Sequence, residues 1–424
     1  MDLGTMMLTR RGWLRHDQVR VGDETMGYSM QRGVSLWTRV TAVHHGAAEL
    51  HRFGTSKWSA VAAPDHRWLV ERTEALCAPP PAPGTIPYGK CQCGCGKTTT
   101  PAKNPVPEKG IERGMPNLYL HGHHARGRRR NPHAAHEYFV EQQALKRGQQ
   151  IVLSRPAETV GELAITVKEA ALLAWIAGDG WQQKPRPSRG RNPEKGYKSG
   201  STPMTYLIAQ TKEQNWAAID LALDGHGRVT RTRERHVNGE LRHDREWRLS
   251  APYARDLTER AGSPKTDCVQ QVLAMSTEQR EAWLTAIIRA EGHISQKPNQ
   301  ASITQISQKA GPVAEAIVIA VYLSGRRPSV YVNTRTGGRH GPVPVWTVTL
   351  TSPCTGEPRA TVTGKTCWTD ESLGVQPTWS VTTDLGTWTA RQGNSVFLTG
   401  CLADEKGRHR LGHRRPWGVS RSSP

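Results

Sequence analysis

The sequence predicts an α+β protein in which a duplicated unit of helices and strands occupies the middle of the chain. The first observation is a pair of apolar segments, residues 172–180 and 284–292, each ending in an acidic residue followed by glycine. The second is that a similar strand, helix and hairpin pattern follows each segment, up to residue 351. The third is that residues 1–75 and 379–401 consist of short alternating runs between turn signals, which is typical of β-strands.

Each apolar segment has its own helix start. Residues 166–169 and 276–279 are capping-box patterns, in which side chains satisfy free amides of the first helical turn. Small residues recur along one face of the first helix, so a second helix backbone can approach it closely. If the two helices pair, Asp179 and Glu291 meet at one end of the pair.

Two carboxylates brought together repel each other unless a cation lies between them. Hard oxygen ligands suit Mg²⁺, and a bound Mg²⁺ can activate water and stabilise a displaced phosphate oxygen. Asp179 and Glu291 therefore indicate a metal-dependent phosphodiesterase. The alternative is a pair of ordinary buried helices that each stop at a glycine.

Both apolar segments resemble the LAGLIDADG motif of homing endonucleases, of the kind that carries two motifs in one chain. The resemblance implies an αββαββ-type saddle over residues 166–351, whose concave face of antiparallel strands lies in the DNA major groove. It implies that Asp179 and Glu291 each help to hold Mg²⁺, one for each DNA strand. Lys212 and Lys309 are candidates for the basic residue near the scissile phosphate, and Gln210 and Gln308 for positioning water. Exposed polar strand residues are the alternative for these four.

Basic residues are concentrated around the predicted sheets. The loop after residue 180 carries six basic residues and one acid, which suits a DNA backbone. We expect DNA contacts from arginines of this loop and of the two hairpins, namely Arg186, Arg189, Arg191, Arg231, Arg233, Arg235, Arg248 and Arg335. Trp247 and Trp346 are expected at equivalent places in the two units.

The composition favours a nucleic-acid partner. Lys and Arg number 57 against 37 Asp and Glu, a formal net charge of +20, which favours a polyanion. No apolar run is long enough to predict a membrane span. Eight cysteines are too few for a disulfide scaffold in a chain of this length. We expect a cytoplasmic, monomeric protein, in a bacterial or phage-infected cell, that binds double-stranded DNA at a long specific site.

The two ends of the chain resemble the Hint domain of phage-type inteins. Residues 4–9, 21–24 and 63–70 resemble its opening blocks, and residues 379–401 its closing blocks. The resemblance implies an all-β domain made of residues 1–75 and 352–401, with the nuclease inserted in it. Its site positions are His66, Ser380, Asp384 and Cys401. His66 would assist an acyl shift; a hydrogen bond within a β turn is the alternative.

The residues that splicing requires are missing from these blocks. The chain starts Met1-Asp2-Leu3, without the Cys or Ser nucleophile of the first step, and Cys401 follows Gly400 without the terminal Asn. We therefore expect an intein-derived endonuclease that makes double-strand breaks and whose Hint domain does not splice. The alternatives are an active intein that carries the nuclease as its nested homing domain, and a binding-only protein of the maturase or repressor kind.

Residues 76–130 differ in composition from their surroundings. A Pro-rich linker precedes Cys91, Cys93, Cys95 and His123, which are predicted to hold structural Zn²⁺ in a small Cys/His module that resembles one in phage-type endonucleases. Solvent-exposed thiols are the alternative. A basic run ends this region. Residues 131–165 are expected to be a connector with a helix at 136–147, and residues 402–424 a basic tail.

Overall fold

The computed structural model describes residues 1–55, 58–73, 89–91, 97–105, 111–117, 135–146, 149–183, 204–237, 240–295, 303–334, 344–350, 359–361 and 369–401. The chain divides into two compact units. The larger unit comprises residues 1–69 and 139–424, and the smaller one residues 70–138. The larger unit contains an all-β part and a part with helices and antiparallel strands.

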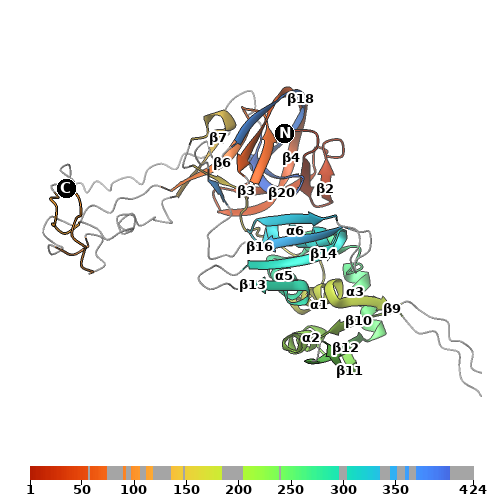
Figure 1. Ribbon diagram of the computed structural model, residues 1–424. Helices are drawn as coiled ribbons and strands as arrows, with labels where there is room; N and C mark the ends of the chain where they lie inside the picture. Colours follow the sequence, from red (N-terminus) through yellow and green to blue (C-terminus); the bar gives the residue numbers. More distant parts are fainter. Residues whose placement is uncertain are drawn as a thin grey trace, which may run out of the picture. The chain divides into compact units, whose positions relative to one another are not determined.

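The all-β part is an eight-stranded sheet built from both ends of the sequence (Figure 1). Its strand order is β18-β4-β3-β1-β19-β20, with β2 paired to β1 and β5 paired to β4. The strands are β1 (Met6–Thr9), β2 (Gly12–Arg15), β3 (Glu24–Ser29), β4 (Val34–Thr55), β5 (Trp58–Ala62), β18 (Thr369–Thr383), β19 (Thr387–Gln392) and β20 (Ser395–Gly400). Antiparallel pairing of β4 with β18, and of β1 with β19, joins the two ends of the sequence in one sheet. Its core includes edge-to-face contacts among Phe53, Trp58 and Trp68.

The middle of the chain forms two four-stranded antiparallel sheets with the same strand order. The first sheet is β9-β10-β12-β11 and the second is β13-β14-β16-β15. The strands are β9 (Gly180–Gln183), β10 (Thr205–Gln210), β11 (Gly227–Val237), β12 (Glu240–Leu249), β13 (Gly292–Ser295), β14 (Ile303–Lys309), β15 (Pro328–Asn333) and β16 (Val345–Leu350). The chain is therefore a mixed α and β protein with a duplicated unit.

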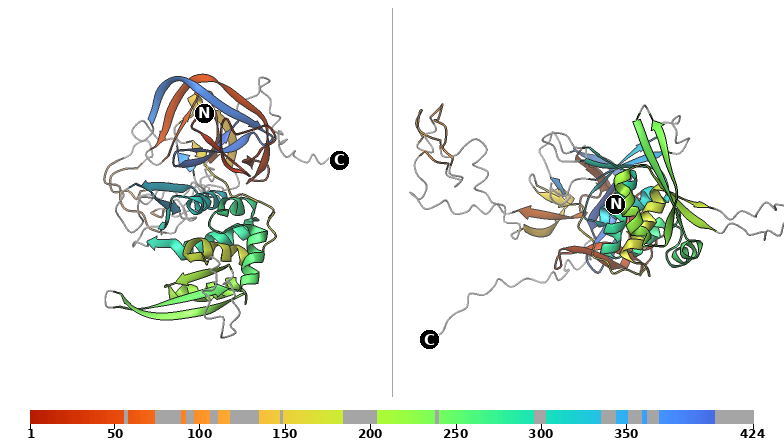
Figure 2. Two further views of the ribbon diagram at one scale, coloured as in Figure 1. Left: turned by 90° about the vertical axis from the view of Figure 1, so that its right-hand side faces the viewer. Right: turned by 90° about the horizontal axis from the view of Figure 1, so that it is seen from below.

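Two helices lie side by side between these sheets, as Figures 1 and 2 show. They are α1 (Val167–Asp179) and α5 (Thr277–Glu291), and each starts with a complete capping box, on Thr166 and on Ser276. α2 (Trp216–Leu223), preceded by the 3₁₀ helix η6 (Glu213–Asn215), packs against α1, and α6 (Pro312–Leu323) packs against α5. Two further helices, α3 (Ala251–Ala261) and α4 (Cys268–Ala274), join the two repeats and were not predicted from the sequence.

The sheet register corrects one expected equivalence. Gly180 pairs with Ile208, which pairs with Trp247. Gly292 pairs with Ile306, which pairs with Val348. Val348, and not Trp346, therefore occupies the position of Trp247.

The helix expected at residues 136–147 is also wrong. The segment forms β7 (Ala135–Glu141) and the 3₁₀ helix η4 (Gln142–Ala144). The run Tyr138-Phe139-Val140 has the aromatic and β-branched side chains that favour a strand. The remaining strands are β6 (Arg67–Thr73), β8 (Gln150–Val152) and β17 (Arg359–Thr361), and β17 pairs with β8.

The all-β part contacts the duplicated part through α6 and the connector. The Tyr322 hydroxyl on α6 lies 3.1 Å from that of Thr389 on β19. The Arg391 guanidinium lies 2.6 Å from the Glu315 carboxylate. Buried Arg280 on α5 donates to the connector at the Ala157 carbonyl, at 2.8 Å. None of the helices in the described ranges is long and apolar enough to span a membrane.

Candidate active site

The helices α1 and α5 approach each other closely at Gly178. A Cβ atom at this position would lie 3.0 Å from the Cβ atom of Ala290 and 3.2 Å from Cγ of Glu291. A larger residue would therefore push the helices apart. Because Gly178 precedes Asp179 and Ala290 precedes Glu291, the close approach places the two predicted carboxylates at the same end of the helix pair.

The Asp179 carboxyl is partly buried and held in place by the first sheet. Gln210 Nε2 donates to Asp179 Oδ2 at 2.6 Å. The Gln210 side-chain oxygen accepts from the Lys212 backbone N–H at 2.9 Å, so the orientation of the amide is fixed. Burial, and next the charge of Glu291, raise the pKa of Asp179 to about 6 against the opposing effect of Lys212 and Lys265. A carboxyl with such a pKa is typical of functional sites.

Two lysines lie at the carboxyl ends of the paired helices. Lys212 Nζ donates to the carbonyls of Ala290, at 3.0 Å, and of Arg289, at 3.2 Å. Lys265 Nζ donates to the carbonyl of Ala177 at 2.6 Å. Free carbonyls and the helix dipole both favour a cation at these ends. Each ammonium group therefore lies next to the carboxylate pair without neutralising it by a direct ion pair among the described contacts.

The position of Lys265 at the candidate site was not predicted from the sequence. It lies between α3 and α4, in a stretch without a recognised pattern, and reaches α1 only because those helices pack as they do. Burial lowers its pKa, while Glu291 and Asp179 act in the opposite direction, which places the ammonium group near both carboxylates. A lone lysine in a turn gave no signal of this role.

The second repeat does not reproduce the arrangement of Gln210 and Lys212. The Gln308 side-chain oxygen accepts from the Lys309 backbone N–H at 3.0 Å, and the Lys309 side chain is exposed. Counted from the paired isoleucines, Ala310 takes the position of Lys212. Among the described contacts, none joins Lys309 or Gln308 to a carboxylate of the site, and their roles stay predictions.

The predicted DNA-contacting arginines fall into two groups. Arg231 and Arg233 on β11 pair in register with Glu246 and Asp244 on β12, and these four residues line a cavity of about 280 Å³ that also contains Gln210. Arg248 also lies on β12 and Arg235 on β11. The others, Arg186, Arg189, Arg191 and Arg335, lie outside the described residues.

The site positions expected in the all-β part are mostly buried. His66 Nε2 lies 2.6 Å from Thr399 Oγ1, and burial, then the chain's amino group and Arg67, lower its pKa. Burial raises the pKa of the Cys401 thiol to about 11, and its sulfur lies 3.5 Å from Thr383 Oγ1. Ser380 is buried, whereas Asp384 is exposed. At neutral pH His66 and Cys401 are thus uncharged.

The predicted zinc ligands are only partly described. Cys91, in the smaller unit, is buried, and its N–H donates to the Lys97 carbonyl at 2.9 Å. Cys93, Cys95 and His123 lie outside the described residues. Within the ranges given above, no group of three or more His, Cys, Asp or Glu side chains is arranged to hold a metal ion.

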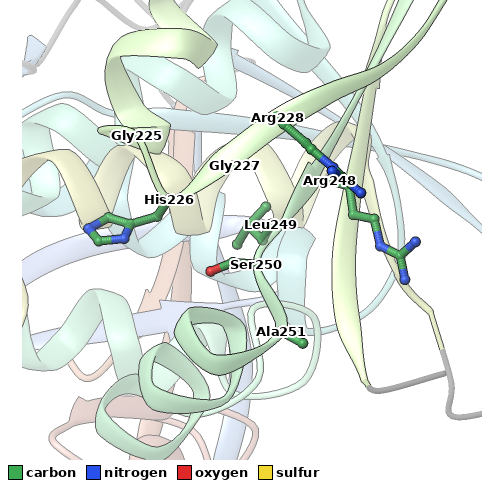
Figure 3. Close-up of a pocket in the computed structure, with 8 residues that line it drawn as sticks. All are labelled: Gly225, His226, Gly227, Arg228, Arg248, Leu249, Ser250 and Ala251. Atoms are coloured by element: carbon green, nitrogen blue, oxygen red, sulfur yellow. The ribbon is translucent and has the colours of Figure 1, made fainter. Parts of the chain in front are cut away.

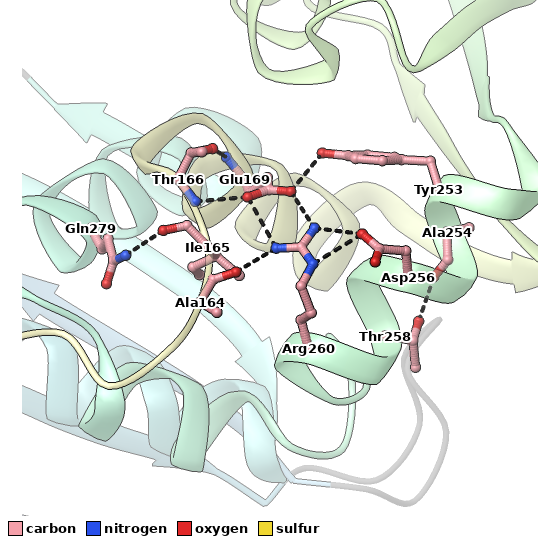
Figure 4. A network of polar contacts seen from close by, with 10 residues as sticks. All are labelled: Ala164, Ile165, Thr166, Glu169, Tyr253, Ala254, Asp256, Thr258, Arg260 and Gln279. Atoms are coloured by element: carbon pink, nitrogen blue, oxygen red, sulfur yellow. Dashed lines mark hydrogen bonds and ion pairs between the residues drawn. The ribbon is translucent and has the colours of Figure 1, made fainter.

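Figure 4 shows a polar network at the start of α1, which is the opposite end of this helix from Asp179. Glu169 accepts from Arg260 Nη2 at 2.6 Å, from the Thr166 backbone N–H at 2.7 Å and from the Tyr253 hydroxyl at 3.1 Å. Burial would raise its pKa, but the Arg260 hydrogen bond and the other donors lower the pKa to about 2. The network fixes α3 against the helix that carries Asp179.

No protein-family model and no curated protein matches the chain. Among solved structures it is similar to I-DmoI in complex with DNA and manganese, with 17% identity, a TM-score of 0.28, and coverage of 44% of this chain and 89% of that chain. Another is a structure of mesophilic variants from the homing endonuclease I-DmoI, with 16% identity, a TM-score of 0.27, and coverage of 44% and 88%. At this level of similarity, arguments about function rest on the site itself.

Proposed function

We propose that the protein is a metal-dependent homing endonuclease that makes double-strand breaks at a long specific DNA site. The observation that carries the proposal is the pairing of Asp179 and Glu291 at the ends of two helices that touch through Gly178. Lys212 and Lys265 beside them can stabilise charge that develops on a phosphate. The duplication supplies one carboxylate for each DNA strand.

The donor set fits a hard divalent cation. The charge of Glu291 disfavours the ionised form of Asp179, a shared Mg²⁺ would offset this repulsion, and both side chains offer oxygen ligands. When bound, the ion would activate water and polarise the phosphate. Asp179 and Glu291 would hold it, and Gln210 would keep Asp179 oriented. Because the described residues supply only two such side chains, the DNA phosphate is expected to complete the coordination.

The all-β part is proposed to be an intein-derived Hint domain that no longer splices, made of residues 1–75 and 352–401. Support comes from the quoted sequence blocks and from the single sheet that joins both ends of the sequence. The nuclease would then span residues 166–351, joined to the Hint half by the connector 131–165. The insert at 76–130 would hold structural zinc, which elemental analysis of the purified protein would detect.

The test is cleavage of a plasmid library of random inserts with purified protein and Mg²⁺, followed by sequencing of the ends. We expect breaks at a defined site, and no breaks when the metal is chelated. A ligated product from a chain flanked by reporter domains would instead support the splicing alternative.

A further inference from the structure

The outer face of the first sheet carries two arginines that face each other directly. Trp247 on β12 donates through its indole N–H to Asp220 on α2, at 2.6 Å, so Trp247 faces the helices. Because strand side chains alternate, Arg248 points to the opposite face. Arg228 on β11 pairs with Arg248 in register, so both guanidinium groups lie on that outer face.

Neither of these two cations has an ion-pair partner among the described residues, although Glu246 lies two residues before Arg248 on the same face of β12. Within the described ranges, no side-chain hydrogen bond is found for either guanidinium group. Like charges directly opposite each other in a ladder destabilise a sheet unless an anion lies between them. Figure 3 shows the two side chains extending together beside a cavity of about 510 Å³, while His226 points the other way. His226 is stacked on Tyr253, with ring centroids 4.0 Å apart.

The position of the arginine pair in the sheet favours contact with DNA phosphates over contact with base edges. Trp181, Leu207, Arg248 and Arg228 form one row across the four strands, from β9 to β11. Three strand intervals span about 14 Å, whereas the major groove is about 12 Å wide. A sheet seated in the groove therefore brings its outermost strand β11, which carries Arg228, to the edge of the groove, where the phosphates lie, with Arg248 beside it on the adjacent strand β12. The chemistry of a paired guanidinium site also suits phosphate oxygens.

The second sheet has no equivalent pair. Counted from Gly180 and Gly292, the corresponding row is His293, Gln305, Thr349 and Ser329. Gln305 Nε2 donates to Thr349 Oγ1 at 3.2 Å, so two side chains of this row already form a hydrogen bond with each other. It contains neither arginine nor lysine. The two faces of the duplicated unit thus differ in charge at equivalent positions.

We infer that Arg228 and Arg248 form a backbone-phosphate clamp for DNA on the first repeat, and that the second repeat lacks this clamp. The inference rests on the proposed function, since it requires the outer faces of the sheets to meet DNA. Of the two equivalent rows, only the row of the first repeat then makes salt-dependent phosphate contacts. These contacts fall on the first half of the DNA site. Contacts from the second row come from hydroxyl, amide and imidazole groups.

The experiment measures the binding of the full-length protein to a short fluorescent duplex of mixed sequence at several salt concentrations, without divalent metal. Replacing both arginines (R228Q and R248Q together) is expected to reduce the slope of log affinity against log salt by about 2, since each lost phosphate contact removes about one counterion. The charge-retaining pair R228K and R248K should keep the slope. The matched control, S329A with T349A at the equivalent positions, should also keep it.

The outcomes separate this inference from the proposed function. If the unmodified protein does not bind the duplex, the proposed function fails and the clamp fails with it. If the protein binds DNA but the glutamine variant keeps the unmodified slope, only the clamp is overturned. The clamp is also overturned if S329A with T349A reduces the slope of log affinity against log salt as much as R228Q with R248Q does. Circular dichroism spectra and melting temperatures of all variants confirm that each compared protein is folded.

Discussion

Gly178 on α1 lies against Ala290 on α5 so closely that a methyl group added to the glycine would come within 3.0 Å of the alanine Cβ atom. This contact sets the distance between the two helices at the carboxylate end. The same contact determines where the neighbouring acids, Asp179 and Glu291, lie. The contact therefore links the packing of the helices to the geometry of the candidate site.

Replacing Gly178 with alanine is expected to lower stability by about 1–3 kcal/mol, the usual cost of overpacking a tight contact. Alanine favours a helix by about 0.5–1 kcal/mol over glycine, so a net loss would come from the clash. Adding A290G should recover part of the loss by giving back the space. Urea unfolding of the two single variants and the double variant measures the coupling. Additive effects in this cycle would contradict direct contact at Gly178.

Replacing Glu169 with glutamine is expected to lower stability at neutral pH by about 1.5–3 kcal/mol, the contribution of hydrogen bonds to a charged group. The pKa of Glu169 is lowered from 4.5 to about 2 in the folded protein. Its contribution is therefore fully present above pH 4.5 and is lost as the pH falls through the interval from 4.5 to about 2. Unfolding measured from neutral to acidic pH should show the difference between variant and unmodified protein shrinking. A difference independent of pH would contradict the role of the charge.

Replacing Arg391 with alanine is expected to weaken the attachment of the all-β part to the duplicated part. Its guanidinium lies 2.6 Å from Glu315, and 5.5 and 5.3 Å from the ring centroids of Trp13 and Trp346. Loss of one partner of a buried pair costs about 3–5 kcal/mol, and partial exposure reduces this to about 2–4 kcal/mol. Calorimetry should show a lower melting temperature, or two transitions in place of one.

An exposed ion pair provides the control for that variant. Arg52 lies 3.6 Å from Glu371, with side-chain exposures of 53% and 64%. Such pairs contribute about 0–1 kcal/mol, so R52A should leave the melting profile nearly unchanged. Equal effects of R391A and R52A would show that the Arg391 contacts do not hold the two parts together.

Replacing Asp179 with asparagine is expected to stabilise the metal-free protein. The pKa of Asp179 is raised from 3.8 to about 6 on folding, so stability falls as the pH rises through this interval and stays lower above it. Removing the charge should raise stability at neutral pH by about 1–3 kcal/mol, since one pKa unit corresponds to about 1.4 kcal/mol. Chemical unfolding in the presence of a chelator measures the difference. A variant less stable than the unmodified protein at neutral pH would contradict the unfavourable burial of this carboxylate.

The parts of the site that follow from local sequence could be predicted. The capping boxes at Thr166 and Ser276, the small residue Gly178 and the acids that end the helices are local signals, and the structure shows these helices packed together. Features of the site that depend on packing between elements distant in the sequence could not be predicted. Lys265 reaches the site only through the placement of α3 and α4.

Register and connection length account for the other differences. β10 ends at Gln210 and α2 begins at Trp216, whereas β14 ends at Lys309 and α6 begins at Pro312. The two connections differ in length, and Lys309 lies one residue short of the position that corresponds to Lys212, so the similar lysine does not reach the same place. The expected equivalence of Trp247 and Trp346 failed for a related reason, since a shift of two residues along a strand keeps the same face. Periodicity alone does not distinguish these registers.

If the protein is the proposed endonuclease, both paired carboxylates are needed to cut both DNA strands. The most direct measurement is cleavage of the selected target by D179N and by E291Q, with DNA binding measured on the same proteins. We predict that each variant loses double-strand cleavage in Mg²⁺ by at least about 100-fold, the scale of a lost catalytic group, while its affinity for the target stays within about 10-fold. Full double-strand cleavage by either variant would show that the two carboxylates are not both required.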